Sequence, residues 1–366
     1  MDEGSKGIIV GATPLSEGVV KGQVRYYGYA VPDLVQHCSF EEVAHLLLYK
    51  ELPTAVQLKS FQQQVAGFRD LPPALKQVLE RIPRATHPTD VLRTACSTLG
   101  TLEPELGRRP DAIALRLLSC FSSILLYWHH FASSGTRIAC VTSPEDSIAL
   151  HFLKLLTQRL VHDPLIVKAI DTTLTIYAEY EFNVSTFAAR VTASTLSDFY
   201  SCVIAAIATV RGPLLSGASE GVVRLMSAFK SPADALEKLH EMRKRRQLFP
   251  SFHSQPSAVP DSRTPLLRTL SHSLSTQPFG QRDFQSIADA MEDYLQRKAS
   301  IYPSLDFFIG TVYRHCGVPE DCYAGLYVLA RSVGWAAHIF EQRGANKLIR
   351  PTALYEGQEP RPVPKL

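Results

Sequence analysis

The sequence predicts an all-α protein with a short β segment at its N-terminus. Apolar residues recur at helical spacing behind helix-capping residues along most of the chain, whereas strand signals are almost confined to the first thirty residues. The chain has 366 residues, of which 45% are hydrophobic. It can therefore bury a large core, and its length predicts two or three domains.

The N-terminal segment is rich in β-forming residues and punctuated by glycine. Residues 7–11 and 19–29 predict short strands or a hairpin. After Pro32 the pattern becomes helical. Ser39, with Glu42 three residues later, forms a capping box that opens an amphipathic helix at Phe40.

The most apolar stretch is residues 112–128, where Arg116 and several serines interrupt the run. It is shorter than a membrane-spanning helix, so we expect a buried helix there. We also expect Thr89 or Asp90 to cap a helix over 91–99, and Ser143 to open another. One or two long helices are predicted within 171–208, and further helices at 232–246 and 284–299.

Two segments differ from this helical pattern. Residues 249–281 are rich in Pro, Ser and Thr and contain a helical island at 266–274, which predicts either a surface loop or a loop that closes over a ligand. Residues 358–366 contain three prolines, which is typical of a disordered tail or an extended arm.

Composition argues against several classes of function. Net charge is +3 with dispersed basic residues, so no nucleic-acid partner is predicted. The basic run at 243–246 is either a solvated helix end or a contact for a phosphorylated ligand such as coenzyme A. The seven cysteines lack zinc-site spacing, which predicts reduced thiols and no metal. No secretory signal is evident, so we expect a cytoplasmic protein without a membrane segment.

Ordered motifs extend over residues 7–357 and resemble, in this order, those of the citrate synthase family, in particular the short bacterial-type citrate and 2-methylcitrate synthases. The motifs are Tyr26-Tyr-Gly-Tyr, Phe40-Glu-Glu-Val-Ala-His, His87-Pro-Thr-Asp, Tyr177-Ala-Glu-Tyr, Glu181-Phe-Asn-Val-Ser-Thr-Phe, Arg211-Gly-Pro-Leu-Leu-Ser-Gly, Tyr302-Pro-Ser-Leu-Asp-Phe, Arg331-Ser-Val-Gly-Trp and Asn346-Lys-Leu-Ile-Arg-Pro.

The resemblance implies a helical homodimer. It predicts an N-terminal β segment at 1–30, a large helical domain at 31–214 and 321–357, an inserted small domain at 215–320, and a tail at 358–366. In the family, a cleft between the two domains binds a 2-oxo dicarboxylate and an acyl-CoA, with no permanently bound cofactor. The reaction is a condensation followed by thioester hydrolysis.

The resemblance also assigns two candidate catalytic residues. Asp306 matches the base that removes a proton from the acyl carbon, a role for which a carboxylate needs a tuned pKa. His253 matches the histidine that polarises the keto group. Its surroundings have changed, because the family's Gly-Phe-Gly-His reads Pro250-Ser-Phe-His here.

Four residues match positions that hold the 2-oxo acid. Arg263, Arg331 and Arg350 correspond to carboxylate-binding arginines, and Arg350 would reach into the partner subunit's site. A guanidinium grips a carboxylate with two parallel hydrogen bonds. Tyr180 replaces a histidine of the family, and its phenol can still donate one hydrogen bond.

The thioester side is altered more. Leu215 stands where the family has the histidine that stabilises the enol, and removing one such donor costs about 10²–10³ in rate. Ser216 is either a substitute donor or a small packing residue. Tyr27 replaces an arginine, which weakens a contact with the CoA phosphates.

Three hypotheses therefore stay open at the level of sequence. The first is a condensing enzyme with an altered acyl preference, of the citrate, methylcitrate or alkylcitrate type. The second is a catalytically impaired member that binds carboxylates or pairs with an active relative. The third is another CoA reaction, such as thioester hydrolysis or carbon–carbon cleavage, on the same scaffold.

Overall fold

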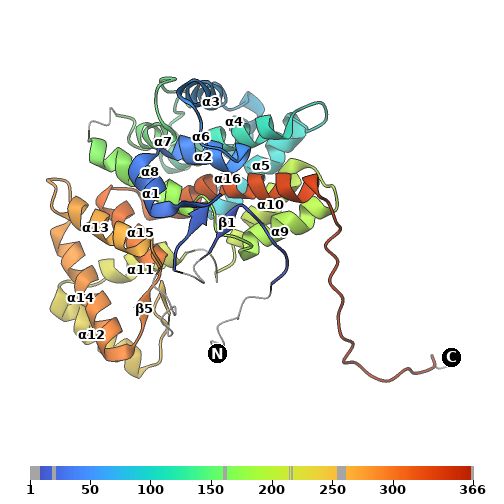
Figure 1. The fold of residues 1–366 in the computed structure, drawn as a ribbon. Coiled ribbons are helices and arrows are strands. Elements are labelled where there is room, and N and C mark those ends of the chain that lie inside the picture. The colour runs from blue at the N-terminus through green and yellow to red at the C-terminus, as the bar shows by residue number, and fades with distance from the viewer. Residues whose placement is uncertain are drawn as a thin grey trace.

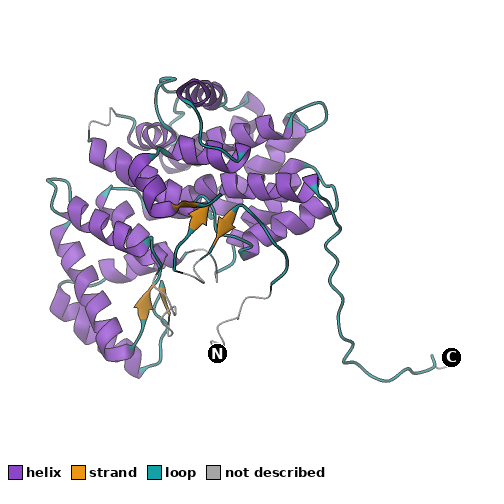
Figure 2. Cartoon of the chain, viewed as in Figure 1, coloured by secondary structure: helices purple, strands orange, loops and turns teal. Residues whose placement is uncertain are grey.

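The computed structural model describes residues 9–18, 22–159, 163–213, 215, 217–253 and 261–363, with the backbone alone of residue 253. It confirms the all-α class. Helices dominate the described part of the chain, and each of its strands is two residues long (Figure 2).

The elements follow one another in the order β1 (Ser16–Glu17), β2 (Arg25–Tyr26), β3 (Tyr29–Ala30), α1 (Val31–His37), α2 (Phe40–Tyr49), α3 (Ala55–Gly67), α4 (Pro73–Leu79), α5 (Pro88–Leu102), α6 (Pro110–Ser134), α7 (Ile148–Thr157), α8 (Pro164–Tyr177), α9 (Val184–Ser194), α10 (Phe199–Val210), α11 (Ala218–Ser227), α12 (Pro232–Lys244), β4 (Phe252–His253), α13 (Thr264–Ser275), α14 (Arg282–Ala299), β5 (Tyr302–Pro303), α15 (Leu305–His315), the 3₁₀ helix η2 (Glu320–Cys322) and α16 (Tyr323–Gly344).

Helix α16 is the centre of the larger group of helices. It contacts α2, α5, α6, α8, α9 and α10, which surround it (Figure 1). Most of its residues are buried, including Trp335, which is completely buried. A helix that is apolar around most of its circumference is expected to lie inside a core rather than on its surface.

Helices α11 to α15 form a second group to one side of α16 (Figure 1). They contact mainly one another and reach the larger group through α13 and α15, which pack on α8. This grouping falls in the region where the sequence predicts an inserted small domain. The boundaries at 215 and 320 stay a prediction.

The N-terminal strands form an antiparallel sheet in the order β1-β2-β3. Strand β2 and the start of β3 fall in the predicted stretch 19–29, whereas β1 lies outside both predicted stretches and residues 9–11 form no strand. Ser16 is opposite Tyr26 in its register. The buried Tyr26 hydroxyl lies 3.2, 3.1 and 3.1 Å from the carbonyls of Thr175, Ile176 and Glu179. Carbonyls at the end of a helix lack partners within it, so this tyrosine fastens the C-terminal end of α8.

Helix starts partly follow the sequence predictions. The capping box of Ser39 and Glu42 is confirmed at α2. The predicted cap at Thr89 or Asp90 was wrong. Helix α5 begins at Pro88, where a proline fits without losing a hydrogen bond, and His87 caps it. The start at Ser143 was also wrong, since residues 144–145 form a turn and Ser147 caps α7.

The region 171–208 contains parts of three helices, not one or two. Asn183 caps α9 and Asp198 caps α10, and each accepts hydrogen bonds from the first turn of its helix. These polar side chains interrupt the apolar pattern and start a new helix each time. The breaks create the turn after α8, which carries the predicted site residue Tyr180.

Helix α6 has 25 residues, so the prediction that this segment is too short to span a membrane was wrong. Among the described residues it is the one helix long and apolar enough to do so. However, 89% of its most apolar window is buried inside the protein, which identifies it as a core helix.

The remaining sequence features have mixed outcomes. All seven cysteines are free thiols. The helical island near 266–274 is confirmed as part of α13, while residues 254–260 lie outside the described residues. The basic run 243–246 is exposed at the end of α12. After α16 the chain runs away from the body as an extended segment (Figure 1).

Gly334 allows the end of α8 to approach α16. A Cβ atom at this position would overlap the carbonyl oxygen of Ala178 and the side chain of Glu179. Backbone cannot move aside as a flexible side chain can, so this approach requires glycine.

We therefore expect Gly334→Ala to lower the free energy of unfolding by about 2–4 kcal/mol through overpacking. Gly344→Ala, at the end of the same helix with nothing within 4 Å of its Cβ position, is the matched control and should be neutral or slightly stabilising. Chemical denaturation of both variants measures the difference. Equal stability of the two would show that the approach of α8 is not tight.

Candidate active site

Three chain segments that carry candidate catalytic residues lie together. Strand β4 pairs with β5, so the backbone of His253 is opposite Tyr302, at the start of the segment that leads to Asp306. The Ser304 N–H donates to the Ser251 carbonyl at 2.7 Å. The Ser251 hydroxyl donates at 2.7 Å to the carbonyl of Ala218, which follows the Leu215 turn. The structure describes only the backbone of His253, so the catalytic role of its side chain stays a prediction.

Asp306 lies in the first turn of α15, where the helix dipole favours a negative charge. The Tyr177 hydroxyl, from the end of α8, donates a hydrogen bond to its Oδ1. Burial, together with the Asp306 charge, raises the pKa of Tyr177 well above its ordinary value, so the phenol stays protonated as a donor. Sequence reasoning assigned Tyr177 no role, although it opens the Tyr177-Ala-Glu-Tyr motif.

A second carboxyl group lies near Asp306. Glu220, at the start of α11, has its pKa raised by burial and, to a smaller extent, by the charge of Asp306. Sequence reasoning did not single out Glu220. The sequence feature that could have indicated Glu220 is its position shortly after the motif that contains Leu215.

Leu215 lies in the turn between α10 and α11, with its N–H bonded to the Gly212 carbonyl at 3.0 Å. Its side chain is partly buried against the apolar core and has no polar atom. Ser216, the possible substitute donor, lies outside the described residues. The four histidines that the structure shows buried bond to groups elsewhere, namely His45 to Glu51, His151 to Ser123 and Thr142, His315 to Gln285, and His338 to Glu179.

Arg263 is buried and already well bonded. Its Nε and Nη2 donate to the two oxygens of Asp261 at 3.0 and 2.8 Å, and its Nη1 donates to the Ile176 carbonyl at 3.3 Å. The Tyr180 ring lies 5.0 Å from its guanidinium carbon. Although burial opposes it, the bonds from Arg263 lower the pKa of Asp261. Arg263 thus links the 261–263 segment to α8, and its binding of a substrate carboxylate stays a prediction.

Arg331 differs from Arg263 in its partners. It is only 3% exposed, and its Nε and Nη1 have no hydrogen-bond partner among the described residues. Its guanidinium lies over the ring of Tyr327, 5.2 Å from the centroid. A buried cation with unpaired N–H groups is costly, and such groups are typical of an arginine that receives an anion.

Tyr327 connects the two halves of the site. Its ring packs edge-on against Tyr177 with centroids 4.9 Å apart, while its face receives Arg331. Asp306, Tyr177, Tyr327 and Arg331 therefore form a continuous series of contacts from the candidate base to the candidate anion-binding group. Tyr180, with its pKa raised by burial, lies on the Arg263 side of this series.

Arg350 is exposed and follows α16 in the extended segment. The neighbouring Ile349 N–H donates to Ser194 at 3.1 Å, which ties this part of the segment to the end of α9. In the single chain, Arg350 is therefore a surface residue at the base of the extended segment.

One group of possible metal ligands lies apart from these residues. Side-chain atoms of His129, Asp321 and Cys322 lie within 4.8 Å of one another. Asp321 pairs with His129 at 3.2 Å and accepts a weak hydrogen bond from the Cys322 thiol at 3.8 Å. The polar groups of this cluster thus satisfy one another without a metal.

The contrast between the two buried arginines gives a direct prediction. Arg331→Met should abolish dicarboxylate binding yet destabilise the protein less than Arg263→Met does, because it removes a buried charge without a hydrogen-bonded partner. Arg263→Met should cost about 2–4 kcal/mol, because Asp261 loses its partner. Thermal unfolding and calorimetric titration with oxaloacetate measure both effects. A large destabilisation by Arg331→Met would contradict this account.

Comparison with known proteins adds the family context. The family model described as "Citrate synthase, C-terminal domain" matches residues 4–352. A 2-methylcitrate synthase of Shewanella oneidensis is 41% identical over 362 residues, covering 98% of this chain and 96% of the relative. 2-Methylcitrate synthase 1 of Corynebacterium glutamicum is 35% identical, with 99% and 96% covered.

A solved structure is similar over nearly the whole fold. Citrate synthase of Thermoplasma acidophilum, in a ternary complex with carboxymethyl coenzyme A and oxaloacetate, superposes with a TM-score of 0.89. Its sequence is 26% identical, and the match covers 99% of this chain and 98% of that one.

Proposed function

Since this chain belongs to the citrate synthase family, we propose that it condenses an acyl-CoA with oxaloacetate or a similar 2-oxo dicarboxylate and then hydrolyses the thioester. The observation that carries the proposal is the series of contacts that joins Asp306 to Arg331. A carboxylate at a helix N-terminus suits a base, and a buried guanidinium with unpaired N–H groups suits a carboxylate ligand.

In this proposal Asp306 removes a proton from the carbon beside the thioester carbonyl. That carbon attacks the keto carbon of the 2-oxo acid, and the keto oxygen takes up a proton to become a hydroxyl group. Water then cleaves the carbon–sulfur bond and releases free coenzyme A. Tyr177 holds the Asp306 carboxylate in place, and His253 polarises the keto group from the strand that pairs with β5.

The acyl preference follows from Leu215. An isobutyl group makes the thioester side more apolar than an imidazole would, so we propose an acyl chain longer than acetyl and an alkylcitrate type of product. The lost donor lowers the intrinsic rate by about 10²–10³. Such a rate would suit a specialised pathway better than central metabolism.

We further propose that the active form is a homodimer. Arg350 is exposed in the single chain, and apolar residues of the same extended segment, Leu348, Leu354 and Tyr355, are exposed with it. A second copy of the chain would cover this surface and place Arg350 beside the partner's substrate.

One observation favours a second function. The thioester side has lost a donor at Leu215, whereas the acid side keeps a buried, unpaired Arg331. A chain altered in this way can bind a di- or tricarboxylate without turning it over. The second candidate is therefore a carboxylate-binding or heterodimerising member of the family.

Release of free thiol from acetyl-, propionyl- and hexanoyl-CoA with oxaloacetate decides between the two functions. We expect turnover that is faster with the propionyl or hexanoyl thioester than with acetyl-CoA, because Leu215 makes the thioester side more apolar. The Arg331→Met variant is the control and should release no thiol above background. Absence of turnover with all three thioesters, together with retained oxaloacetate binding, would favour the second candidate.

Restoring the family residue gives a separate test. Leu215→His should raise thiol release with acetyl-CoA by about 10²-fold, because it returns a donor to the developing enolate oxygen. Leu215→Asn, which offers a shorter donor, should give a smaller gain. If neither variant changes the rate, the block lies at Tyr180 or in the altered His253 segment.

A further inference from the structure

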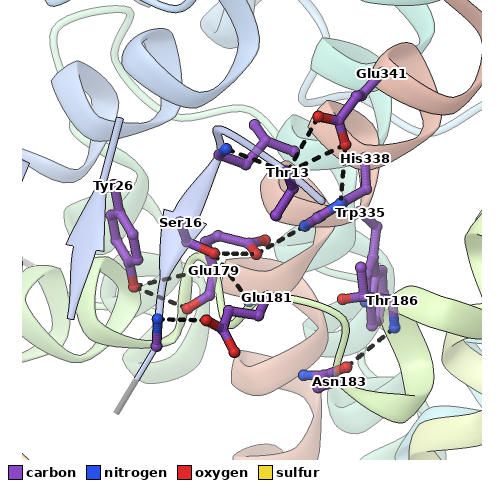
Figure 3. Close-up of polar contacts among 12 residues, drawn as sticks. Thr13, Ser16, Tyr26, Glu179, Glu181, Asn183, Thr186, Trp335, His338 and Glu341 are labelled. Atoms are coloured by element: carbon purple, nitrogen blue, oxygen red, sulfur yellow. Dashed lines mark hydrogen bonds and ion pairs between the residues drawn. The ribbon is translucent and has the colours of Figure 1, made fainter. Parts of the chain in front are cut away.

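A buried carboxylate next to Arg331 has no role in the proposed reaction. Glu179 is completely buried in the turn after α8, where it takes part in a network that joins β1, this turn and α16 (Figure 3). Its Oε1 accepts hydrogen bonds from Ser16 Oγ at 3.0 Å and from His338 Nε2 at 2.8 Å. Its Oε2 has no partner among the described residues.

The hydrogen bonds of the network determine which nitrogen of His338 donates to Glu179. Arg190 Nη1, which can only donate, lies 3.0 Å from His338 Nδ1, so that nitrogen must accept. The proton of a neutral His338 is then on Nε2 and is donated to Glu179. Burial opposes the negative charge, but His338, Arg331 and Ser16 together lower the pKa of Glu179. Glu179 is therefore an anion held by the Ser16 hydroxyl and by Nε2–H of His338.

Outer bonds hold this arrangement in place. Arg190 forms an ion pair with Glu341. Glu341 also accepts a hydrogen bond from Thr13 at 3.1 Å (Figure 3). Ser16 Oγ receives the Glu181 N–H at 3.0 Å. Both ends of the turn and the N-terminal segment thus restrain the position of the Glu179 carboxylate.

Arg331 and Glu179 are close neighbours that do not bond. Arg331, Gly334 and His338 occupy one face of α16, at spacings of three and four residues. The Glu179 side chain lies against Gly334, between the other two, and the charge of Arg331 acts on it. Yet the described residues include no ion pair between Glu179 and Arg331, and both groups keep unpaired polar atoms.

We propose that Glu179 is a positioning residue that compensates the charge of Arg331 from a fixed distance and so leaves the Arg331 N–H groups free for the substrate carboxylate. Ser16 and His338 act as a tether. Without them, Glu179 would turn toward Arg331 and compete with the substrate. The inference rests on the proposed function only in naming that substrate as a 2-oxo dicarboxylate.

The test compares variants that release the carboxylate with one that removes its charge. Calorimetric titration with oxaloacetate alone measures Kd without any need for turnover. Ser16→Ala should raise Kd about fivefold, the effect of one lost hydrogen bond. His338→Leu should raise it about tenfold or more, because the charge-assisted bond is lost. Glu179→Gln should lower Kd about fivefold, because a nearby negative charge that repels the anionic substrate is gone.

The opposite directions of the expected changes in Kd distinguish a positioning role from a general structural disruption. A merely structural role would weaken binding in all three variants. In the double variant Glu179→Gln with His338→Leu, the loss caused by His338→Leu should disappear, since no carboxylate remains to be released. Weaker binding by Glu179→Gln, or an undiminished effect of His338→Leu in the double variant, would overturn the proposal.

A second readout does not depend on the substrate. If the wild type fails to bind oxaloacetate, the proposed function fails, but thermal unfolding still decides the inference. Release of Glu179 by His338→Leu should create a direct pair with Arg331, so Arg331→Met should lower stability more in that background than in the wild type. Equal effects of Arg331→Met in both backgrounds would reject the tether.

Discussion

The ionised carboxylate of Glu179, buried between α8 and α16, is the constraint on which the rest of the site depends. It needs hydrogen-bond donors because an unpaired buried charge is too costly to keep. Ser16 from β1 and His338 from α16 supply them. Satisfying one carboxylate therefore positions three distant segments together. Tyr177, which contacts the candidate base, ends α8 just before this turn, and Tyr180, which lies beside Arg263, is within it.

The site divides into two parts with different chemistry. On the acid side, the guanidinium of Arg263 is hydrogen-bonded to Asp261 and to the end of α8. By contrast, Nε and Nη1 of Arg331 have no hydrogen-bond partner among the described residues. On the thioester side, Leu215 offers no donor and Tyr177 holds Asp306. This protein thus retains what is needed to hold an anionic acid and to place a base, while the group that should stabilise the enolate is missing. Its specificity and its rate are expected to follow from that imbalance.

Stability and function compete at α16. Gly334, the unpaired Arg331 and the buried His338 lie on one face of a helix that is otherwise the apolar centre of the fold. Apolar residues in place of Arg331 and His338 would cost less to bury, so these two residues reduce the stability that the helix could provide, whereas Gly334 is needed for the close approach of α8. The surrounding helices offset that cost, and the charged groups lie on the buried central helix of the fold. A rigid support is what a site needs to keep an arginine poised for its ligand.

The sequence by itself determined the helical class, the capping box at Ser39, the helices near 232–246 and 284–299, and the family, because these depend on local periodicity and on ordered motifs. Only the tertiary structure decided where α5 and α7 begin, the true length of α6, and the different states of Arg263 and Arg331. Two arginines in matching motifs look alike in a sequence. Whether a guanidinium is bonded or open depends on how the chain places its partners, such as Asp261 two residues away and the Ile176 carbonyl 87 residues away for Arg263. Those contacts arise only when the chain folds.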